Sequence, residues 1–248
     1  MSISIIIATK DRHELVKSLL TSISNSLISN FEVIIVDQSN ILINLDAIYN
    51  FPILLLKHSA GASSSRNFGA KFAKNKFLWF LDDDCTISPF SEFKDLSNHL
   101  IYFTEWNERK KSNNLFILSY FFPLLRTIMF IRSSGAPFFI INKEMFFKIG
   151  EYDNNLGPGC RLGAAEDLDL CLRSLLYINK FKKNSYKFSK KIILHHKLEI
   201  HNKNKRNVYL ESRIFVYKKL NNKSLLFFDL VYSLLILDFN RFRLLRSN

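Results

Sequence analysis

The chain has 248 residues, of which 48% are hydrophobic and 24 are phenylalanine. These values argue against a disordered chain and predict one α/β unit with an aromatic core. The 35 Lys and Arg residues outnumber the 22 Asp and Glu residues, so phosphates, nucleic acid and anionic membranes are all candidate partners. The three cysteines, Cys85, Cys160 and Cys171, form no CxxC pair. They indicate neither a disulfide framework nor a zinc knuckle, and they favour a reducing compartment.

No targeting or membrane-spanning segment is predicted. Met1–Ala8 lacks the basic region and the cleavage site of a signal peptide. The longest apolar stretches, Leu115–Ile131 and Leu225–Leu237, are interrupted by charged residues and fall short of the roughly 18 apolar residues that a spanning helix needs. We expect a cytoplasmic protein, and peripheral attachment to the inner face of the cytoplasmic membrane stays open.

The first hundred residues alternate between strand and helix patterns. A helix is predicted over Leu15–Leu27, with Asp11 as its N-cap and Glu14 as the capping-box partner. A second helix carries Phe68 and Phe72. Apolar runs predict strands at Ile3–Ala8, Glu32–Val36, Pro52–Lys57 and Phe77–Leu81. Such alternation predicts a mostly parallel sheet buried on both faces, with ligands at the carboxyl ends of its strands.

The rest of the chain is less regular. Four of the seven glycines lie in Gly150–Gly163, and we expect this loop to shape a pocket. A helix is predicted behind Glu166, with leucines at helical spacing. Strands are predicted at Leu115–Phe122, Ala136–Ile141 and Lys190–Leu194.

Asp82, Asp83 and Asp84 follow the fourth predicted strand. Like charges at this spacing repel one another unless a cation lies between them. In extended geometry Asp82 and Asp84 project to the same side, so one can bind a hard metal directly while the other reaches through water or towards a ribose. A solvated acidic turn is the alternative.

Glu166 and Asp167 open a predicted helix, where backbone N–H groups stabilise a carboxylate in its charged form. An ionised carboxylate at this place can act as a base. Ordinary enrichment of acidic residues in a first helical turn stays an open alternative.

His195 and His196 end a predicted strand, and His201 follows. Because neutral imidazole is a frequent metal ligand, one of these residues is a candidate ligand beside the aspartates. Neighbours on a strand point in opposite directions, so we expect only one of the pair to bind.

Arg66 and Asp37 are candidate ligand-binding residues. Arg66 can bind a diphosphate bidentately, or it can be a helix-surface arginine. Asp37 can accept a hydrogen bond from a nucleobase or ribose, or it can cap a helix.

The ordered motifs together resemble glycosyltransferase family 2 over roughly residues 1–200. They are Ser4–Arg12, Val36–Ser39, Gly61–Gly69, Leu81–Asp84 and Gly163–Asp169. The resemblance implies a GT-A fold, which is a Rossmann-like, mostly parallel central sheet flanked by helices. To this we add a C-terminal helical tail.

The resemblance also implies an inverting hexosyltransferase that uses a nucleotide-diphosphate sugar, with UDP-hexose as the expected donor, and a Mn²⁺ or Mg²⁺ cofactor. Asp167 is the expected base, and Glu166 orients Asp167 or the acceptor. The implied metal ligands are Asp84, Asp82 and His196. The implied nucleotide-sugar-binding residues are Thr9, Asp11, Arg12, Asp37, Arg66, Asp82 and Asp83.

Three parts are expected: a nucleotide-sugar-binding half over 1–100, an acceptor-binding half over 101–215 and an amphipathic helical tail over 216–248. The expected acceptor is a hydroxyl of a cell-surface glycan or a lipid-linked oligosaccharide, as in polysaccharide or lipopolysaccharide biosynthesis. Ser224–Asn248 combines a wide apolar face with three terminal arginines, which predicts attachment to an anionic membrane. Packing of this helix on the protein itself or on a second subunit stays open.

Two other functions compete with this interpretation. A sugar nucleotidyltransferase needs a glycine-rich loop after its first strand, and Ala8–Arg12 contains no glycine. A basic membrane or nucleic-acid adaptor would account for the net charge of +13. Because no nucleic-acid-binding motif accompanies that charge, we expect no nucleic acid among the partners.

Overall fold

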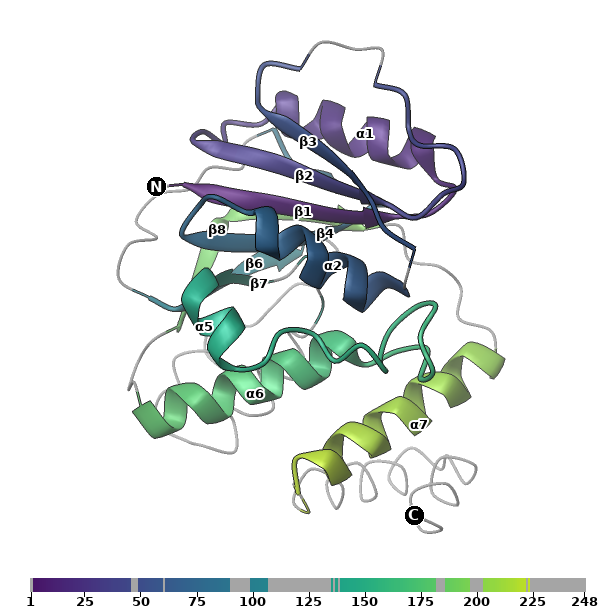
Figure 1. Cartoon of the computed structure of the whole chain (residues 1–248). Coiled ribbons are helices and arrows are strands. Elements are labelled where there is room, and N and C mark those ends of the chain that lie inside the picture. Colours follow the sequence, from purple (N-terminus) through teal and green to yellow (C-terminus); the bar gives the residue numbers. More distant parts are fainter. Residues whose placement is uncertain are drawn as a thin grey trace.

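The computed structural model describes residues 2–45, 49–59, 61–89, 99–106, 135, 137, 139–181, 186–196, 203–221 and 223. Its centre is an eight-stranded sheet in the order β3-β2-β1-β4-β7-β6-β8-β5 (Figure 1). Helices lie against both faces of the sheet (Figure 1). One continuous sheet therefore runs through the whole described part of the chain.

Four parallel strands form one side of the sheet, as the sequence predicts. β1 pairs with β2 and β4, and β2 also pairs with β3, so that all four carboxyl ends lie at one edge. The bounds differ from the predicted ones by one residue at most. The strands are β1 Ile3–Thr9, β2 Phe31–Asp37, β3 Ile53–Lys57 and β4 Phe77–Asp82.

Helix α1 (His13–Ser24) follows β1, but the predicted capping box is wrong. The N-cap is Arg12, and no side chain caps the helix. Asp11 instead has a left-handed backbone with φ of 54°, and its N–H donates to the Ser39 hydroxyl at 2.7 Å. The turn is therefore fixed by the neighbouring strand end rather than by its own acidic side chain.

Two hydrophobic cores lie on opposite faces of the sheet, because successive strand residues point to opposite sides. Ile5 and Ile7 of β1 face α1 and its leucines. Ile6 faces the other side, where helix α2 (Gly61–Phe72), α5 (Lys143–Lys148) and α6 (Glu166–Phe181) pack. The parallel strands are buried on both faces, which explains their continuous apolar sequences.

The other side of the sheet is mixed. β7 runs antiparallel to β4 and β6, β6 runs parallel to β8, and β8 runs antiparallel to β5. The predicted strands at 136–141 and 190–194 correspond to β7 and to part of β8, whereas the one predicted at 115–122 lies outside the described residues. The bounds are β5 Cys85–Ile87, β6 Ile101–Trp106, β7 Phe139–Asn142 and β8 Tyr186–His196.

Helix α7 (Lys203–Lys219) packs against α6. A third, smaller core joins the two helices, with Leu168 and Leu172 on α6 and Val216 and Tyr217 on α7. None of the helices that the structure describes is both long enough and apolar enough to cross a bilayer. The predicted tail at 224–248 lies outside the described part of the chain.

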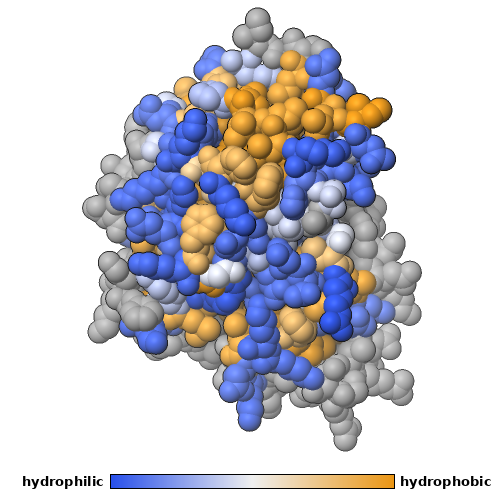
Figure 2. All heavy atoms as spheres, viewed as in Figure 1, coloured by the Kyte–Doolittle hydropathy of each residue, from blue (hydrophilic) through white to orange (hydrophobic). Residues whose placement is uncertain are grey.

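Hydrophobic side chains gather on the upper part of the surface shown in Figure 2. This part of the molecule holds β3 and the segment after β2 (Figure 1). Ile41, Leu42 and Leu54 are exposed large hydrophobic residues, and Leu54 lies on β3 at the end of the strand order. Ile41, at the border of the patch, also lines a cleft beside Asp11 and Arg12.

Candidate active site

The strand register brings polar residues together at the carboxyl edge of the parallel strands. Thr9 at the end of β1 pairs with Asp37 at the end of β2. On its other side, β1 pairs Ala8 with Asp82 at the end of β4. Ligands of open α/β sheets bind at this edge, and most of the predicted site residues lie here.

Asp37 is fully buried and holds the turn that follows β2. Its carboxylate accepts hydrogen bonds from the N–H and hydroxyl of Ser39 and from the N–H of Ile43, and the His13 ring lies 3.3 Å away. Burial raises the pKa of Asp37, but these hydrogen bonds outweigh burial and lower the pKa below its ordinary value. Asp37 is thus a charged anchor for the turn, and its predicted role in base recognition stays a prediction.

Thr9, Arg12 and Asp83 form a second contact group at this edge. The Thr9 hydroxyl donates to Asp83 at 2.8 Å, and Arg12 donates to the other oxygen of Asp83 at 3.2 Å. Burial raises the pKa of Asp83, partly offset by these two partners. Asp83 therefore faces the β1–α1 turn, and beside this turn a cleft opens between Asp11, Arg12 and residues 40–41.

Asp82 and Asp84 converge on a different point. Their carboxylate oxygens and the Cys85 sulfur lie within 4.8 Å of one another. β4 ends at Asp82 and a turn follows, so the two carboxylates meet across a turn rather than along an extended strand. Burial, together with the charges of Asp82 and Asp84, raises the pKa of the Cys85 thiol and so favours its neutral form.

This donor set fits a hard divalent cation, because Mg²⁺ and Mn²⁺ prefer carboxylate oxygens. The register of β5 with β8 pairs Cys85 with His196 and Thr86 with His195. The backbone of His196 therefore lies beside the acidic group, one residue row from Asp84. His201 lies outside the described residues.

Arg66, on α2, connects β4 to the start of α6. Its guanidinium donates to Asp82 at 2.6 Å and to Glu166 at 3.1 Å, and it lies 3.9 Å from Asp167. Burial opposes its charge, but the carboxylates of Asp167, Asp82 and Glu166 raise the pKa of Arg66 well above its ordinary value. The Arg66 Nε atom has no hydrogen-bond partner among the described residues. Arg66 is thus a buried cation shared by three acids, not a surface arginine.

Asp167 is held by Tyr152 as well as by Arg66. The Tyr152 hydroxyl donates to Asp167 at 3.1 Å, and its ring centroid lies 5.4 Å from the Arg66 guanidinium carbon. Burial and the Asp167 charge raise the pKa of Tyr152 well above its ordinary value, so Tyr152 is a stable donor. Side-chain exposure is 19% for Asp167 and 9% for Glu166, so Asp167 is the more accessible acid.

The glycine-rich loop packs closely against this group. Gly157 has φ of 96°, and a Cβ at this position would lie 2.9 Å from the Glu166 carboxyl carbon and 3.0 Å from the Ser63 hydroxyl oxygen. The Ser63 hydroxyl also donates to the Leu156 carbonyl at 2.6 Å. Only glycine allows the loop to come this close, and the approach fixes Glu166 against α2.

Two residues of this arrangement are not among the predicted site residues. Asn67 donates to the Tyr152 carbonyl and to Asn154, and it accepts from the Tyr152 N–H. It thereby attaches the loop before α6 to α2. Tyr152 lies in the segment where only glycines carry a sequence signal, so no motif marks it. Asn67 directly follows Arg66 in the Gly61–Gly69 motif, which was the only available signal.

The chain is similar to known proteins in sequence and in fold. The family model for glycosyl transferase family 2 matches residues 4–128, just over half of the chain. An uncharacterized glycosyltransferase of Haemophilus influenzae is 32% identical over 187 residues, which cover 70% of this chain and 62% of that protein.

Solved structures show the same fold. Staphylococcus aureus TarS 1-349 in complex with UDP-GlcNAc is 18% identical, with a TM-score of 0.58 over 90% of this chain and 67% of that one. The mannosyltransferase PcManGT of Pyrobaculum calidifontis, in complex with GDP-Man and Mn²⁺, is 10% identical, with a TM-score of 0.60 over 88% of this chain and 63% of that one. The expected GT-A fold is confirmed by these neighbours.

The chain spans only part of its relatives, 62% of the Haemophilus protein and 40% of another TarS chain. The family match nevertheless includes the β1–α1 turn, the β2 turn, Arg66 and the Asp82–Asp84 cluster. Glu166 and Asp167 lie beyond the matched residues but within the described fold. The chain belongs to glycosyl transferase family 2.

Proposed function

We propose that the protein transfers a sugar from a nucleotide-diphosphate donor to a hydroxyl of an acceptor glycan. The main support for this proposal is a group of ion pairs around Arg66. Arg66 joins Asp82, at the carboxyl edge of the sheet, to Glu166 and Asp167 at the start of α6. A cation-binding carboxylate pair and a partly exposed carboxylate are thus held in one polar site. Family membership supports this assignment, as do the UDP-GlcNAc and GDP-Man complexes of the structural neighbours.

The donor binds, in this proposal, at the carboxyl edge of the parallel strands. The cleft beside Asp11 and Arg12 takes the nucleoside, and Asn40 and Ile41, in the turn that Asp37 holds, form its other wall. Asp82 and Asp83 complete the nucleotide-sugar site next to Thr9. We infer a UDP-hexose donor, consistent with the UDP-GlcNAc bound by TarS.

Asp84 and Asp82 would hold the divalent cation, with His196 as a further ligand supplied by β8. When bound, Mn²⁺ or Mg²⁺ neutralises the charge that develops on a departing diphosphate. Arg66 adds a fixed positive charge beside Asp82. It prevents the three neighbouring acids from repelling one another before the donor arrives.

Asp167 removes the proton of the acceptor hydroxyl in this mechanism, because the N-terminus of α6 and the nearby Arg66 favour its charged form and because it remains accessible. Tyr152 and Arg66 fix its orientation, and Glu166 orients Asp167 or the acceptor. The acceptor oxygen then bonds to the anomeric carbon while the bond to the diphosphate oxygen breaks. A single displacement of this kind inverts the anomeric configuration.

The acceptor that we propose is a cell-surface glycan or lipid-linked oligosaccharide of the polysaccharide or lipopolysaccharide class. It rests on the sequence of Ser224–Asn248, which predicts attachment to the inner face of an anionic membrane. In liposome flotation, a chain truncated before Ser224 should stay folded and stop floating with anionic vesicles. Flotation unchanged by the truncation, or unfolding caused by it, contradicts the attachment.

Release of nucleoside diphosphate from a panel of nucleotide-sugars, with and without Mn²⁺, tests the proposed activity. We expect metal-dependent release from a UDP-sugar, increased by a suitable acceptor. Release of pyrophosphate from a nucleoside triphosphate would instead indicate a sugar nucleotidyltransferase. Salt-dependent nucleic-acid binding that survives loss of Asp82 and Asp84 would indicate the basic adaptor.

A further inference from the structure

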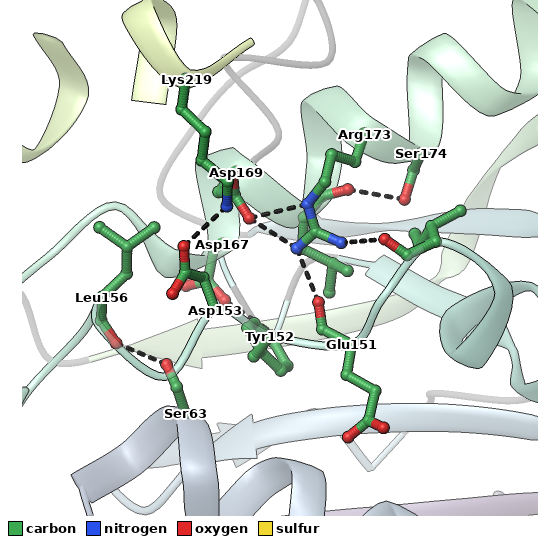
Figure 3. A network of polar contacts seen from close by, with 12 residues as sticks. Ser63, Glu151, Tyr152, Asp153, Leu156, Asp167, Asp169, Arg173, Ser174 and Lys219 are labelled. Atoms are coloured by element: carbon green, nitrogen blue, oxygen red, sulfur yellow. Dashed lines mark hydrogen bonds and ion pairs between the residues drawn. The ribbon is translucent and has the colours of Figure 1, made fainter. Parts of the chain in front are cut away.

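The last residue of α7 forms ion pairs with two acids near the start of α6 (Figure 3). Lys219 donates to Asp153 at 2.7 Å and to Asp169 at 2.9 Å. Asp153 belongs to the loop before the glycine-rich segment, and Asp169 belongs to the first turn of α6. One ammonium group therefore connects three separate segments of the chain.

Asp169 is fully buried, so its charge requires close partners. Its other oxygen accepts from the Nε and Nη2 atoms of Arg173. Arg173 also donates to the carbonyls of Ile149 and Glu151. Two cations and two carboxylates thus form a charge-balanced network, and both of its branches end on the segment 149–153.

Two residues of this network, Asp169 and Asp153, lie close to Asp167 or to its hydrogen-bond partner. Asp169 lies two residues beyond Asp167 on the same helical turn. Asp153 directly follows Tyr152, whose hydroxyl donates to Asp167. Figure 3 shows Lys219 on one side of these residues, with Asp153 and Tyr152 on the loop below it. A shift of Asp153 would therefore move Tyr152, and a shift of Asp169 would move the helical turn that carries Asp167.

The apolar contact between α7 and α6 is made by residues other than Lys219. Val216 and Tyr217 are buried against Leu168 and Leu172, and they supply the apolar contact between the two helices. Arg173 pairs with the Asp169 oxygen that Lys219 does not contact, so we expect this pair to persist in a variant without the Lys219 charge. We therefore expect the Lys219 ammonium to position the loop at 149–153 and the first turn of α6, and to matter less for whether the chain folds.

We propose that Lys219 is a positioning residue that keeps Asp167 in its reactive orientation, by holding Asp153 and Asp169 at fixed places. This proposal rests on the proposed glycosyl transfer. It assigns a role in that reaction to a residue on α7, far along the chain from the strand-end motifs. Lys219 does not touch the reacting atoms.

Lys219→Met tests the proposal, because methionine keeps much of the side-chain volume and removes the charge. Lys218→Met is the matched control, since Lys218 is the neighbouring lysine on the same helix and both lysines are exposed. We expect Lys219→Met to lower kcat roughly 10- to 100-fold, as small misplacements of reacting groups do. Donor affinity should stay within twofold of wild type, and Lys219→Arg should recover much of the rate because it restores a cation.

Hydrogen exchange gives a second readout that does not depend on activity. Amides at 151–157 and in the first turn of α6 should exchange faster in Lys219→Met than in wild type or Lys218→Met. If no nucleotide-sugar is turned over by the wild-type protein, the proposed transfer fails, while hydrogen exchange still tests the Lys219 contacts. A kcat for Lys219→Met equal to that of Lys218→Met, or unchanged exchange at 151–157, overturns the proposal.

Discussion

Two groups of charged side chains lie at the carboxyl edge of the sheet, and they are built differently. The first, which we call the strand-end group, joins the ends of neighbouring strands. It consists of Thr9, Arg12, Asp37 and Asp83. The second, which we call the crossing group, connects α2 and β4 to α6. It consists of Arg66, Asp82, Glu166 and Asp167. The first group depends on the sheet register and on the turns directly after β1 and β4, whereas the second depends on how the later part of the chain folds back onto the sheet.

From this difference we expect the two groups to have separate tasks. Strand-end residues are held rigidly by the sheet, which suits the binding of a donor that must keep one position. The crossing group contains the more accessible acid, Asp167, and the buried cation that faces it. We expect substitutions in the first group to change donor binding or folding, and substitutions in the second to change transfer.

The largest effect on binding should come from Asp84→Ala. Outer partners of metal ligands are worth about 10- to 100-fold in affinity, so loss of a direct ligand should weaken Mn²⁺-dependent UDP binding by more than roughly 100-fold. Calorimetry with UDP and Mn²⁺ measures this change. Asp83→Asn is the matched comparison, because Asp83 faces Thr9 and Arg12, and it should keep more of the metal dependence. Unchanged affinity in Asp84→Ala would remove the metal assignment.

Arg66→Met should affect both stability and transfer. Removing one partner of a buried ion pair leaves uncompensated charge, so the free energy of unfolding should fall by about 3 kcal/mol. Arg66→Lys should recover part of the stability but not the transfer rate, because one ammonium cannot reproduce the planar fork that binds Asp82 and Glu166 together. Urea unfolding and transfer assays of both variants separate the two effects. Full activity in Arg66→Met would mean that the crossing group is not part of the site.

Asp37→Asn tests the strand-end group through its pH dependence. Burial raises the pKa of Asp37, but hydrogen bonds from Ser39 and Ile43 lower it overall. The charged form therefore stabilises the fold above the unfolded-state pKa of about 4, and this stabilisation is lost as the pH falls through the folded-state pKa. We expect a loss of about 2 kcal/mol at pH 7. The difference between variant and wild type should shrink below pH 4, and a constant difference would contradict the charged anchor.

The smallest effect is expected for Ser63→Ala, which removes the hydrogen bond to the Leu156 carbonyl. Loss of one buried hydrogen bond should lower the free energy of unfolding by about 1 kcal/mol. Thermal unfolding measures this change. If the transfer rate falls strongly although the loss of stability is small, contact between the glycine-rich loop and α2 is required for the reaction.

The sequence predicts the strand-end group well, for a physical reason. The four parallel strands are continuous apolar runs, and their polar end residues must meet at one edge. The turn after β4 was less predictable, because Asp82 and Asp84 converge on one point whereas Asp83 turns to Thr9 and Arg12. Alternation along an extended strand does not describe a turn, so the inward orientation of Asp83 towards Thr9 could not be anticipated.

The crossing group could be predicted only in part. The start of α6 at Glu166 follows from its helical leucine pattern and acidic first turn. The contacts of Tyr152 and Lys219 have no local signal, because they depend on long-range packing of α2, α6 and α7. The capping box at Asp11 failed for a related reason, since the Ser39 hydroxyl of a neighbouring strand end binds that turn.

Asp167→Asn tests the division between donor binding and transfer most directly. The amide is nearly isosteric with the carboxylate, but it cannot take up the proton of the acceptor hydroxyl. The decisive measurement is the single-turnover rate at saturating donor, with donor occupancy measured by calorimetry on the same sample. We expect wild-type donor affinity and a rate lower by about 100- to 10,000-fold, the usual contribution of a positioned base. A near-native rate, or a loss of donor affinity that explains the slower rate, would contradict this expectation.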